Sequence, residues 1–276
     1  MRPHLLGVDH VVILVNDLDH AQAAWSRLGF TLTPRGFHSI GTRNHCLMFG
    51  SDYLELLALG APHPVTAAFA AFLEGGEGAA AIAFATDDAQ ACWTDLRAAG
   101  IAADPPVDFS RPVQLDGHSR DARFRVTQLP PAATPGSRSF LCQHFTRELV
   151  WLPAYQQHPL GATGIAGLTL RVDEVDTAAA RYGEVTGVAP QRAGRSARVS
   201  LDRFCIEFVP ADAAASTGRP APAIERLELY VRDLDQARAQ LAQAGVAVEP
   251  GNDRSLVLSA PIHGVSLSLR ADPGPR

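Results

Sequence analysis

One carboxylate lies within an otherwise largely apolar segment. Glu55 interrupts residues 53–59, whose other members are Tyr, Leu and Ala, a composition typical of a buried strand. Burial of an ionised carboxylate without a partner costs several kcal/mol or raises the pKa of the carboxyl. We therefore expect Glu55 to meet a metal, a ligand or a hydrogen-bonding partner, and we predict it as a candidate catalytic residue. The alternative is a glutamate at a strand edge whose carboxylate reaches solvent.

Other polar residues could contact a substrate. His38 and Asn44 lie at a glycine-containing bend, from which they could reach over a site or simply satisfy the backbone of the turn. Arg111 and Arg123 could pair with an anionic group of a substrate. The alternative for both arginines is ordinary exposure to solvent. We predict His38, Asn44, Arg111 and Arg123 as candidate substrate-binding residues.

The elements that must position these residues recur in a fixed order. An apolar strand, an acidic turn, an Ala-rich helix, a Gly and further strands appear four times along the chain, which is the signature of an internal repeat. The first strands are expected at residues 7–15, 79–85, 168–172 and 227–231. The helices are expected between Asp17 and Gly29, at 89–99, around 177–184 and up to Gly245. Later strands are expected at 30–33, 44–49, 53–59, 124–129, 139–145, 204–209, 255–258 and 265–269.

The repeat predicts an α+β fold of four βαβββ modules paired into two curved-sheet cups. A single module cannot bury both its helix and one face of its sheet, so modules should pair and leave a concave side free for a ligand. Residues 151–163 contain Pro153, Pro159 and Gly161 and form the natural connection between the pairs. We predict an N-terminal domain over residues 1–152, which carries the site, and a C-terminal domain over residues 153–276.

Several short motifs resemble those of a known family. They are residues 9–12 (Asp-His-Val-Val), 17–19 (Asp-Leu-Asp), 36–44, 53–57 (Tyr-Leu-Glu-Leu-Leu), 140–144 (Phe-Leu-Cys-Gln-His) and 148–151 (Glu-Leu-Val-Trp). With them the chain resembles the glyoxalase-like members of the vicinal-oxygen-chelate superfamily. The resemblance covers most of the chain at the level of the repeat, and the first two modules at the level of motifs. It implies a divalent metal held inside the cup by side chains from the first and fourth strands of paired modules.

The resemblance also assigns ligand positions. His10 falls on the first-strand position and Glu55 on the fourth-strand position of the first module. The second module departs from the family pattern, because its first strand offers only Ala and Ile there. Its fourth strand offers Gln143 or His144, of which only one can enter the cup, since neighbouring side chains of a strand point to opposite faces. Matching the apolar positions favours Gln143, with His144 as the alternative. Such a donor set suits Zn, Ni, Mn or Fe(II).

The second pair of modules appears degenerate. Gly167 and Arg226 stand where the first module has His10. Glu207 is the retained carboxylate, and Ser266 or Ser268 is its counterpart in the fourth module. Because a metal centre needs several convergent donors, we expect a scaffold, an interface or a metal-free ligand pocket in the second cup.

Composition limits the partners and the location. A formal net charge of −5 and scattered arginines provide no basic field, so we expect a small-molecule ligand and no nucleic acid. The apolar run near the N-terminus is interrupted by Asn16, Asp17 and Asp19, so we expect no signal peptide, no membrane span and a cytoplasmic location. The four cysteines form no CxxC pair, which favours free thiols over a zinc or redox motif. The expected oligomeric state is a monomer or a homodimer.

Three functions fit these features. The leading hypothesis is a metal-dependent enzyme with lyase or isomerase chemistry on a small oxygenated substrate. A divalent cation could bind two adjacent oxygens and stabilise an enediolate or oxyanion, while Glu55 moves a proton. The alternative from another class is a non-catalytic binding protein of the bleomycin-resistance type. The third is an extradiol-type dioxygenase, whose iron site would need His144 to join His10 and Glu55.

Overall fold

Two eight-stranded sheets form the framework of the protein. The computed structural model describes residues 1–38, 40–115, 117–215, 217–251 and 254–274. The strands of the first sheet are β1 (Leu5–Leu14), β2 (Gly36–Phe37), β3 (Arg43–Met48), β4 (Tyr53–Ala58), β5 (Gly78–Thr86), β6 (Val107–Leu115), β7 (His118–Gln128) and β8 (Arg138–His144). Those of the second are β9 (Ala162–Val172), β10 (Gln191–Ala193), β11 (Ser196–Leu201), β12 (Phe204–Pro210), β13 (Ala223–Val231), β14 (Val248–Pro250), β15 (Leu256–Leu258) and β16 (Ser266–Ala271).

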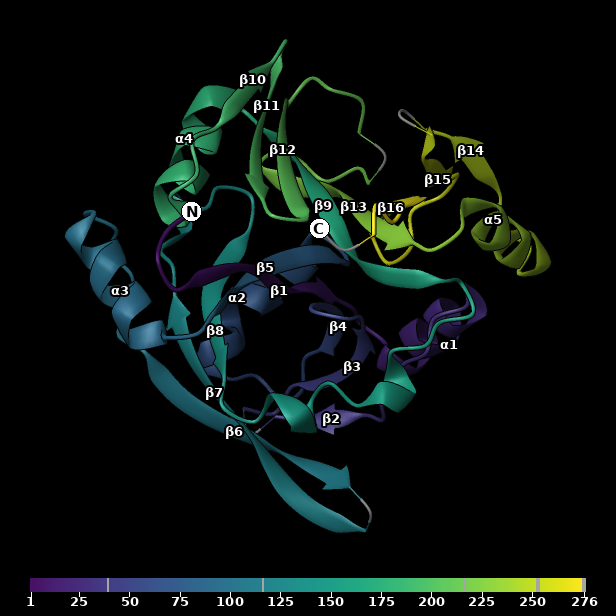
Figure 1. Cartoon of the computed structure of the whole chain (residues 1–276), viewed down its shortest axis with the longest axis horizontal. Helices are drawn as coiled ribbons and strands as arrows, with labels where there is room; N and C mark the ends of the chain where they lie inside the picture. Colours follow the sequence, from purple (N-terminus) through teal and green to yellow (C-terminus); the bar gives the residue numbers. More distant parts are fainter. Residues whose placement is uncertain (39, 116, 216, 252–253, 275–276) are drawn as a thin grey trace.

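Both sheets have the same topology. The strand orders are β2-β3-β4-β1-β5-β8-β7-β6 and β10-β11-β12-β9-β13-β16-β15-β14, and the sheets occupy the lower and upper parts of Figure 1. The two central strands of each sheet, β1 with β5 and β9 with β13, run antiparallel. Each central strand also has the fourth strand of its own module beside it in parallel. The predicted α+β fold of paired βαβββ modules is therefore confirmed.

Aspartates start three of the module helices. The helices are α1 (Leu18–Arg27), α2 (Ala67–Glu74), α3 (Ala89–Ala98), α4 (Val175–Thr186) and α5 (Leu234–Gln243). Asp17, Asp88 and Asp233 precede α1, α3 and α5, and each carboxylate accepts hydrogen bonds from backbone N–H groups of the first turn. Three of the four acidic turns are thus N-caps, whereas Glu174 before α4 makes no side-chain cap bond. None of the helices in the described ranges is long and apolar enough to cross a membrane.

The main hydrophobic core is continuous across both sheets. One cluster of buried residues includes Trp25 of α1 and Ile13 of β1 together with Tyr182 of α4 and Leu168 of β9. These residues lie on the helix-facing sides of the sheets, so the concave sides remain for other contacts. Short 3₁₀ helices complete the described fold: η1 (Pro64–Thr66), η2 (Pro131–Ala133), η3 (Arg147–Leu149) and η4 (Pro153–Tyr155).

Some elements differ from the prediction. Residues 30–33 form no strand, and β9 already begins at Ala162, inside the predicted connection. The helix α2 was not predicted, because none of its residues is buried and its apolar sequence has no polar face. The strand β6 was also not predicted, because its residues are largely exposed and include Pro112. It forms a long hairpin with β7, which projects from the body of the protein (Figure 1).

A buried carboxyl joins the two sheets. Asp52 lies in the turn between β3 and β4, and its Oδ1 accepts the backbone N–H of Ile165 in β9 at 2.8 Å. The Ser51 hydroxyl donates to its other oxygen at 3.1 Å. Burial raises the pKa of Asp52 to about 7, although these hydrogen bonds oppose the shift. The ionised form of Asp52 is therefore disfavoured in the folded protein.

This raised pKa predicts a pH-dependent effect of Asp52→Asn. Between about pH 4 and pH 7 the folded carboxyl holds a proton that the unfolded chain has lost, so its contribution to stability falls as the pH rises through this window. A pKa raised from 3.8 to about 7 corresponds to roughly 4 kcal/mol. Asp52→Asn keeps an oxygen acceptor for Ile165 and should raise the melting temperature at pH 8, with little change at pH 4. Exposed Asp121→Asn is the control, and a lower melting temperature of Asp52→Asn at pH 8 would contradict the assignment.

Candidate functional site

An irregularity in β1 turns two adjacent side chains into the first cup. The pairing of β1 with β5 shifts register between Val8 and His10, so Asp9 is the extra residue of a bulge, a feature that re-aims side chains and is common beside active sites. Asp9 and His10 are only 1% and 4% exposed. The His10 Nδ1 lies 2.6 Å from the Asp9 Oδ2, and the His144 Nε2 lies 3.1 Å from the same oxygen.

Asp9 is held as an ionised carboxylate. Burial alone would raise its pKa, but His144 and His10 outweigh this effect and hold the pKa of Asp9 well below its usual value. Because a carboxylate only accepts hydrogen bonds, the Nδ1–H of His10 donates to Asp9. The Nε2 atom of His10 is therefore the ring nitrogen that is left for other contacts.

Glu55 lies between two imidazoles. Its Oε2 is 3.8 Å from the His10 Nε2, and its Oε1 is 3.8 Å from the His38 Nε2. Both distances are too long for a hydrogen bond. The Asn44 amide donates to the Glu55 Oε1 at 2.5 Å, and Glu55 is only 8% exposed. The sequence-based expectation that Glu55 needs a partner is met by Asn44, which fixes one of its two oxygens.

The ring of His38 is oriented in the same way as that of His10. Its Nδ1 lies 2.6 Å from the Thr42 Oγ1, and its Nε2 lies 3.4 Å from the Asn44 amide nitrogen. An amide NH₂ only donates, so the Nε2 is the acceptor and the Nδ1–H donates to Thr42. Burial, and to a smaller extent the charge of Arg111, lowers the pKa of His38, although Glu55 opposes this effect. The ring is thus neutral near pH 7, the state that a metal ligand requires.

Aromatic rings surround these polar groups. Tyr53 stacks on the His10 ring with centroids 4.4 Å apart, and Phe140 meets the same ring edge-on at 5.5 Å. Trp151 packs edge-on against Tyr53 at 5.5 Å and against His144 at 5.0 Å. These contacts hold both imidazoles in place and keep the surroundings apolar, which strengthens electrostatic interactions inside the cup.

The preference for Gln143 over His144 is corrected by the structure. The Gln143 Oε1 accepts the backbone N–H of Ala89, and its Nε2 donates to the Asp87 carbonyl. Gln143 therefore contacts the start of α3 instead of the cup. His144 does face the cup, because neighbouring side chains alternate, but it bonds to Asp9 and not to Glu55.

Strand register explains why neither residue matches Glu55. In β4, Glu55 pairs with Val12 of β1, and in β8, Phe140 pairs with Ala83 of β5. Val12 and Ala83 hold corresponding places in their modules, since each lies five residues before the aspartate that caps the following helix, Asp17 or Asp88. By this register Phe140 holds the place of Glu55 in the second module, three residues before Gln143. An apolar ring there leaves the second module without a donor at the position that corresponds to Glu55.

The two arginines have different places. Arg111 lies on the His38 side of the cup, because a Cβ added to Gly36 would be 3.7 Å from its Nη1. Arg123 is exposed, and its guanidinium lies 5.7 Å from the ring centroid of Phe145. Since its neighbours Ala122 and Phe124 belong to the buried cluster of the cup, alternation turns Arg123 to the other face. Of the two arginines, the structure therefore supports only Arg111 as a residue near the site.

A second group of donors also lies in the cup. Ligand atoms of Asp9, Cys142 and His144 all lie within 4.8 Å of one another. Burial raises the pKa of Cys142 well above its usual value, so its thiol stays protonated and is a poor ligand. The Asp9 oxygen already bonds two imidazoles. This group is therefore a weaker ligand set than its short distances alone would suggest.

Some members of the site were not identified from the sequence. Asp9 and Thr42 orient the two imidazoles, and neither was predicted as a site residue. Asp9 directly precedes His10, which on a regular strand would place the two side chains on opposite faces. The bulge that brings the two side chains together has no distinct residue pattern. The position of Asp9 next to His10 was therefore the only feature of the sequence that could have indicated its role.

Comparisons with known proteins agree with this architecture. A family model described as a glyoxalase-like domain matches residues 8–186. A search of curated proteins found no significant match. A hypothetical protein from Staphylococcus aureus superposes with a TM-score of 0.71 at 12% identity, over 96% of this chain and 99% of that one.

Two further solved structures share the fold. A mutant of 4-hydroxymandelate synthase from Streptomyces coelicolor has a TM-score of 0.67 and 16% identity, and the match covers 99% of this chain and 94% of that chain. A fusion of a xylose isomerase-like TIM barrel with 4-hydroxyphenylpyruvate dioxygenase has a TM-score of 0.58 and 14% identity, over 96% of this chain and 48% of that chain. At these identities the likeness concerns the fold alone.

Proposed function

The chain belongs to the glyoxalase-like domain family within the vicinal-oxygen-chelate superfamily, and from this premise we propose that its first cup is a metal-dependent active site for proton transfer on a small oxygenated substrate. The reaction class is that of a lyase or an isomerase. The observation that carries the proposal is the placement of Glu55 between the Nε2 atoms of His10 and His38, with a carboxylate oxygen 3.8 Å from each.

The donor set fits a divalent metal. His10 and His38 each have their Nδ1 occupied by a fixed partner, Asp9 or Thr42, the arrangement that orients metal-binding imidazoles. Together with Glu55 they offer two nitrogens and a carboxylate, which suits Zn, Ni, Mn or Fe(II). His38 thus replaces Gln143 as the third proposed ligand. A bound ion of this kind would polarise the substrate oxygens and stabilise negative charge on them.

The chain's own residues would handle the proton. The Asn44 amide holds the Glu55 Oε1, so the Oε2 is the oxygen available to accept a proton from a carbon next to a carbonyl group. The electrons of the broken C–H bond move to the carbonyl oxygen, and Glu55 returns the proton at the end. Arg111, on the His38 side of the cup, would attract an anionic substrate group. The aromatic rings of Tyr53 and Trp151 would exclude water.

Exchange of substrate hydrogens with solvent tests this role of Glu55. Dihydroxyacetone, which has adjacent carbonyl and hydroxyl oxygens, serves as the probe, and deuterium incorporation in D₂O is followed by NMR. Glu55→Gln should lower the catalysed exchange at least about 100-fold, since it removes the general base. Glu207→Gln, the register counterpart in the other cup, is the matched control. Unchanged exchange in folded Glu55→Gln would contradict the proposal, as would wild-type protein that neither exchanges the probe nor carries metal.

One observation favours a second candidate function. Two imidazoles and one carboxylate are also the donor set of non-heme Fe(II) oxygenases. The dioxygenase hypothesis needed His144 beside His10 and Glu55, but the structure offers His38 for that place. Elemental analysis of protein purified without chelator separates the two functions. Stoichiometric iron together with oxygen consumption would favour oxygenation, whereas zinc, nickel or manganese would favour proton transfer.

A further inference from the structure

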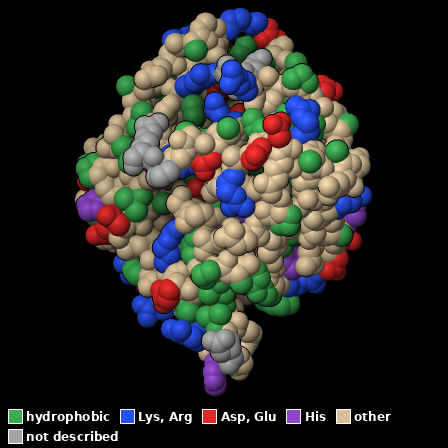
Figure 2. Space-filling model, turned by 45° about the vertical axis from the view of Figure 1, so that its right-hand side comes forward, with side chains coloured by type: hydrophobic (Ala, Val, Ile, Leu, Met, Phe, Trp, Pro, Cys, Tyr) green, Lys and Arg blue, Asp and Glu red, His purple; other side chains and the backbone are tan. Residues whose placement is uncertain are grey.

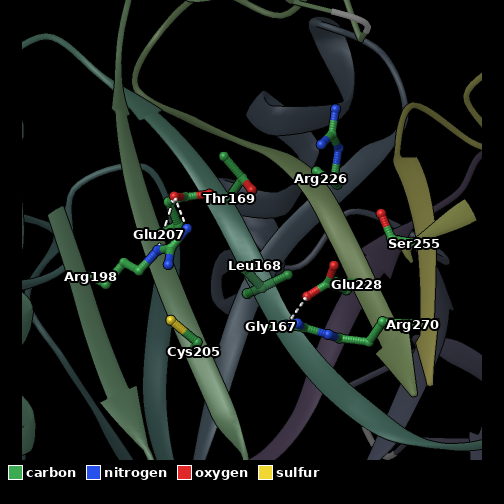
Figure 3. Close-up of a pocket in the computed structure, with 10 residues that line it drawn as sticks. All are labelled: Gly167, Leu168, Thr169, Arg198, Cys205, Glu207, Arg226, Glu228, Ser255 and Arg270. Atoms are coloured by element: carbon green, nitrogen blue, oxygen red, sulfur yellow. Dashed lines mark hydrogen bonds and ion pairs between the residues drawn. The ribbon is translucent and has the colours of Figure 1, made fainter. Parts of the chain in front are cut away.

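The second cup contains a charged cavity outside the proposed active site. The cavity has a volume of about 220 Å³ and is lined by three arginines and two glutamates together with smaller residues. Figure 3 shows Arg198 and Glu207 on one wall and Glu228 and Arg270 on the other, with Arg226 apart from both pairs. In the upper part of Figure 2, basic and acidic side chains gather around a hollow surface.

Strand register explains why this cup is open. Glu207 pairs with Thr169 as Glu55 pairs with Val12, and Cys205 pairs with Gly167 as Tyr53 pairs with His10. Gly167 therefore stands where the first cup has an imidazole. A Cβ at Gly167 would lie 2.4 Å from the Cys205 carbonyl oxygen, so the position accepts only glycine. The absence of a side chain there leaves room for a ligand.

Among the described residues, the charges of the cavity leave one cation in excess. Arg198 donates to the Glu207 Oε1 through its Nε at 3.0 Å and its Nη2 at 2.8 Å. Arg270 donates to the Glu228 Oε2 at 3.0 Å. Arg226 has no ion pair among the described residues, and its Nε is buried without a hydrogen-bond partner there. A guanidinium without an ion pair can donate hydrogen bonds to a planar anion such as a carboxylate.

We propose that the second cup binds a small hydroxycarboxylate. The ligand carboxylate pairs with Arg226, which has no ion pair among the described residues. The Glu207 Oε2 and the Glu228 Oε1 have no bond to the arginines that hold the other oxygens. These two oxygens accept hydrogen bonds from ligand hydroxyl groups. The site is separate from the proposed active site, and its described residues form no group of three metal donors within 4.8 Å of one another.

Calorimetric titration of the full chain with L-lactate tests the proposal. Lactamide has nearly the same shape without the charge and should bind at least tenfold more weakly. Arg226→Gln should weaken lactate binding at least tenfold, because it removes the one arginine of the cavity that has no ion pair among the described residues. Arg238→Gln, an exposed arginine on α5, is the matched control and should bind like the wild type. Glu55→Gln should also bind lactate normally, since it changes only the first cup.

Several results would overturn the assignment. Wild-type protein that does not bind lactate, or that binds lactamide equally well, has no carboxylate site in this cup. Tighter binding of inorganic phosphate than of lactate would show that the ligand class is wrong. If circular dichroism shows that Arg226→Gln is unfolded, Arg226→Lys is used, which keeps the charge but loses the planar fork. Unchanged lactate affinity of whichever folded variant is measured would place the site elsewhere.

Discussion

The double variant His10→Ala/Glu55→Ala is expected to lose its divalent metal, whereas Glu207→Ala is expected to keep it. The double substitution removes two of the three ligands proposed for the first cup, which leaves only His38. A single imidazole holds a metal weakly, because tight binding needs several donors at one point. Glu207 belongs to the second cup and bonds to Arg198, so its loss leaves the three donors intact.

Metal content after identical purification without chelator measures this difference. The expected outcome is about one ion per chain for the wild type and Glu207→Ala, and a decrease to background for the double variant. Circular dichroism confirms that each variant is folded. If metal disappears from Glu207→Ala and persists in the double variant, the metal site lies in the second cup and the proposed assignment is wrong.

Asp9→Ala is expected to have the largest effect of any single substitution in the first cup. It removes the shared acceptor of His10 and His144 and leaves two buried imidazole nitrogens without their partner. Removing one partner of a buried ion pair costs about 3–5 kcal/mol of stability. The released His10 ring should also lower metal affinity about 10- to 100-fold, as expected when the orienting partner of a ligand is lost.

Denaturant unfolding and a metal-competition titration measure these two effects. Exposed Asp121→Ala should change neither quantity. Asp9→Asn retains the side-chain volume but not the charge, and it should lose metal affinity even if its stability falls less. Wild-type stability and metal affinity in folded Asp9→Ala would show that the carboxylate does not orient the imidazoles.

Local residue patterns predicted most of the repeated elements. Aspartates before Ala-rich segments indicated the starts of α1, α3 and α5, because a carboxylate that caps a helix acts on N–H groups two or three residues away. The order of strands and helices then predicted the paired modules. The exposed hairpin strand β6 and the helix α2 escaped prediction, since neither has the alternating or periodic burial from which such elements are recognised.

The composition of the β4 segment was enough to single out Glu55 and to predict that it needs a partner, because an apolar strand sequence indicates burial and a buried carboxylate is costly without a partner. The identity of that partner, Asn44, and the approach of His38 depend on how the bend before β3 folds over the cup. The role of Asp9 depends on a bulge in β1, and the exclusion of Gln143 depends on the register of β8 against β5. A shift of one residue along a strand reverses the face of every side chain. Strand pairing between distant segments therefore decided which polar groups converge, and residue types alone could not.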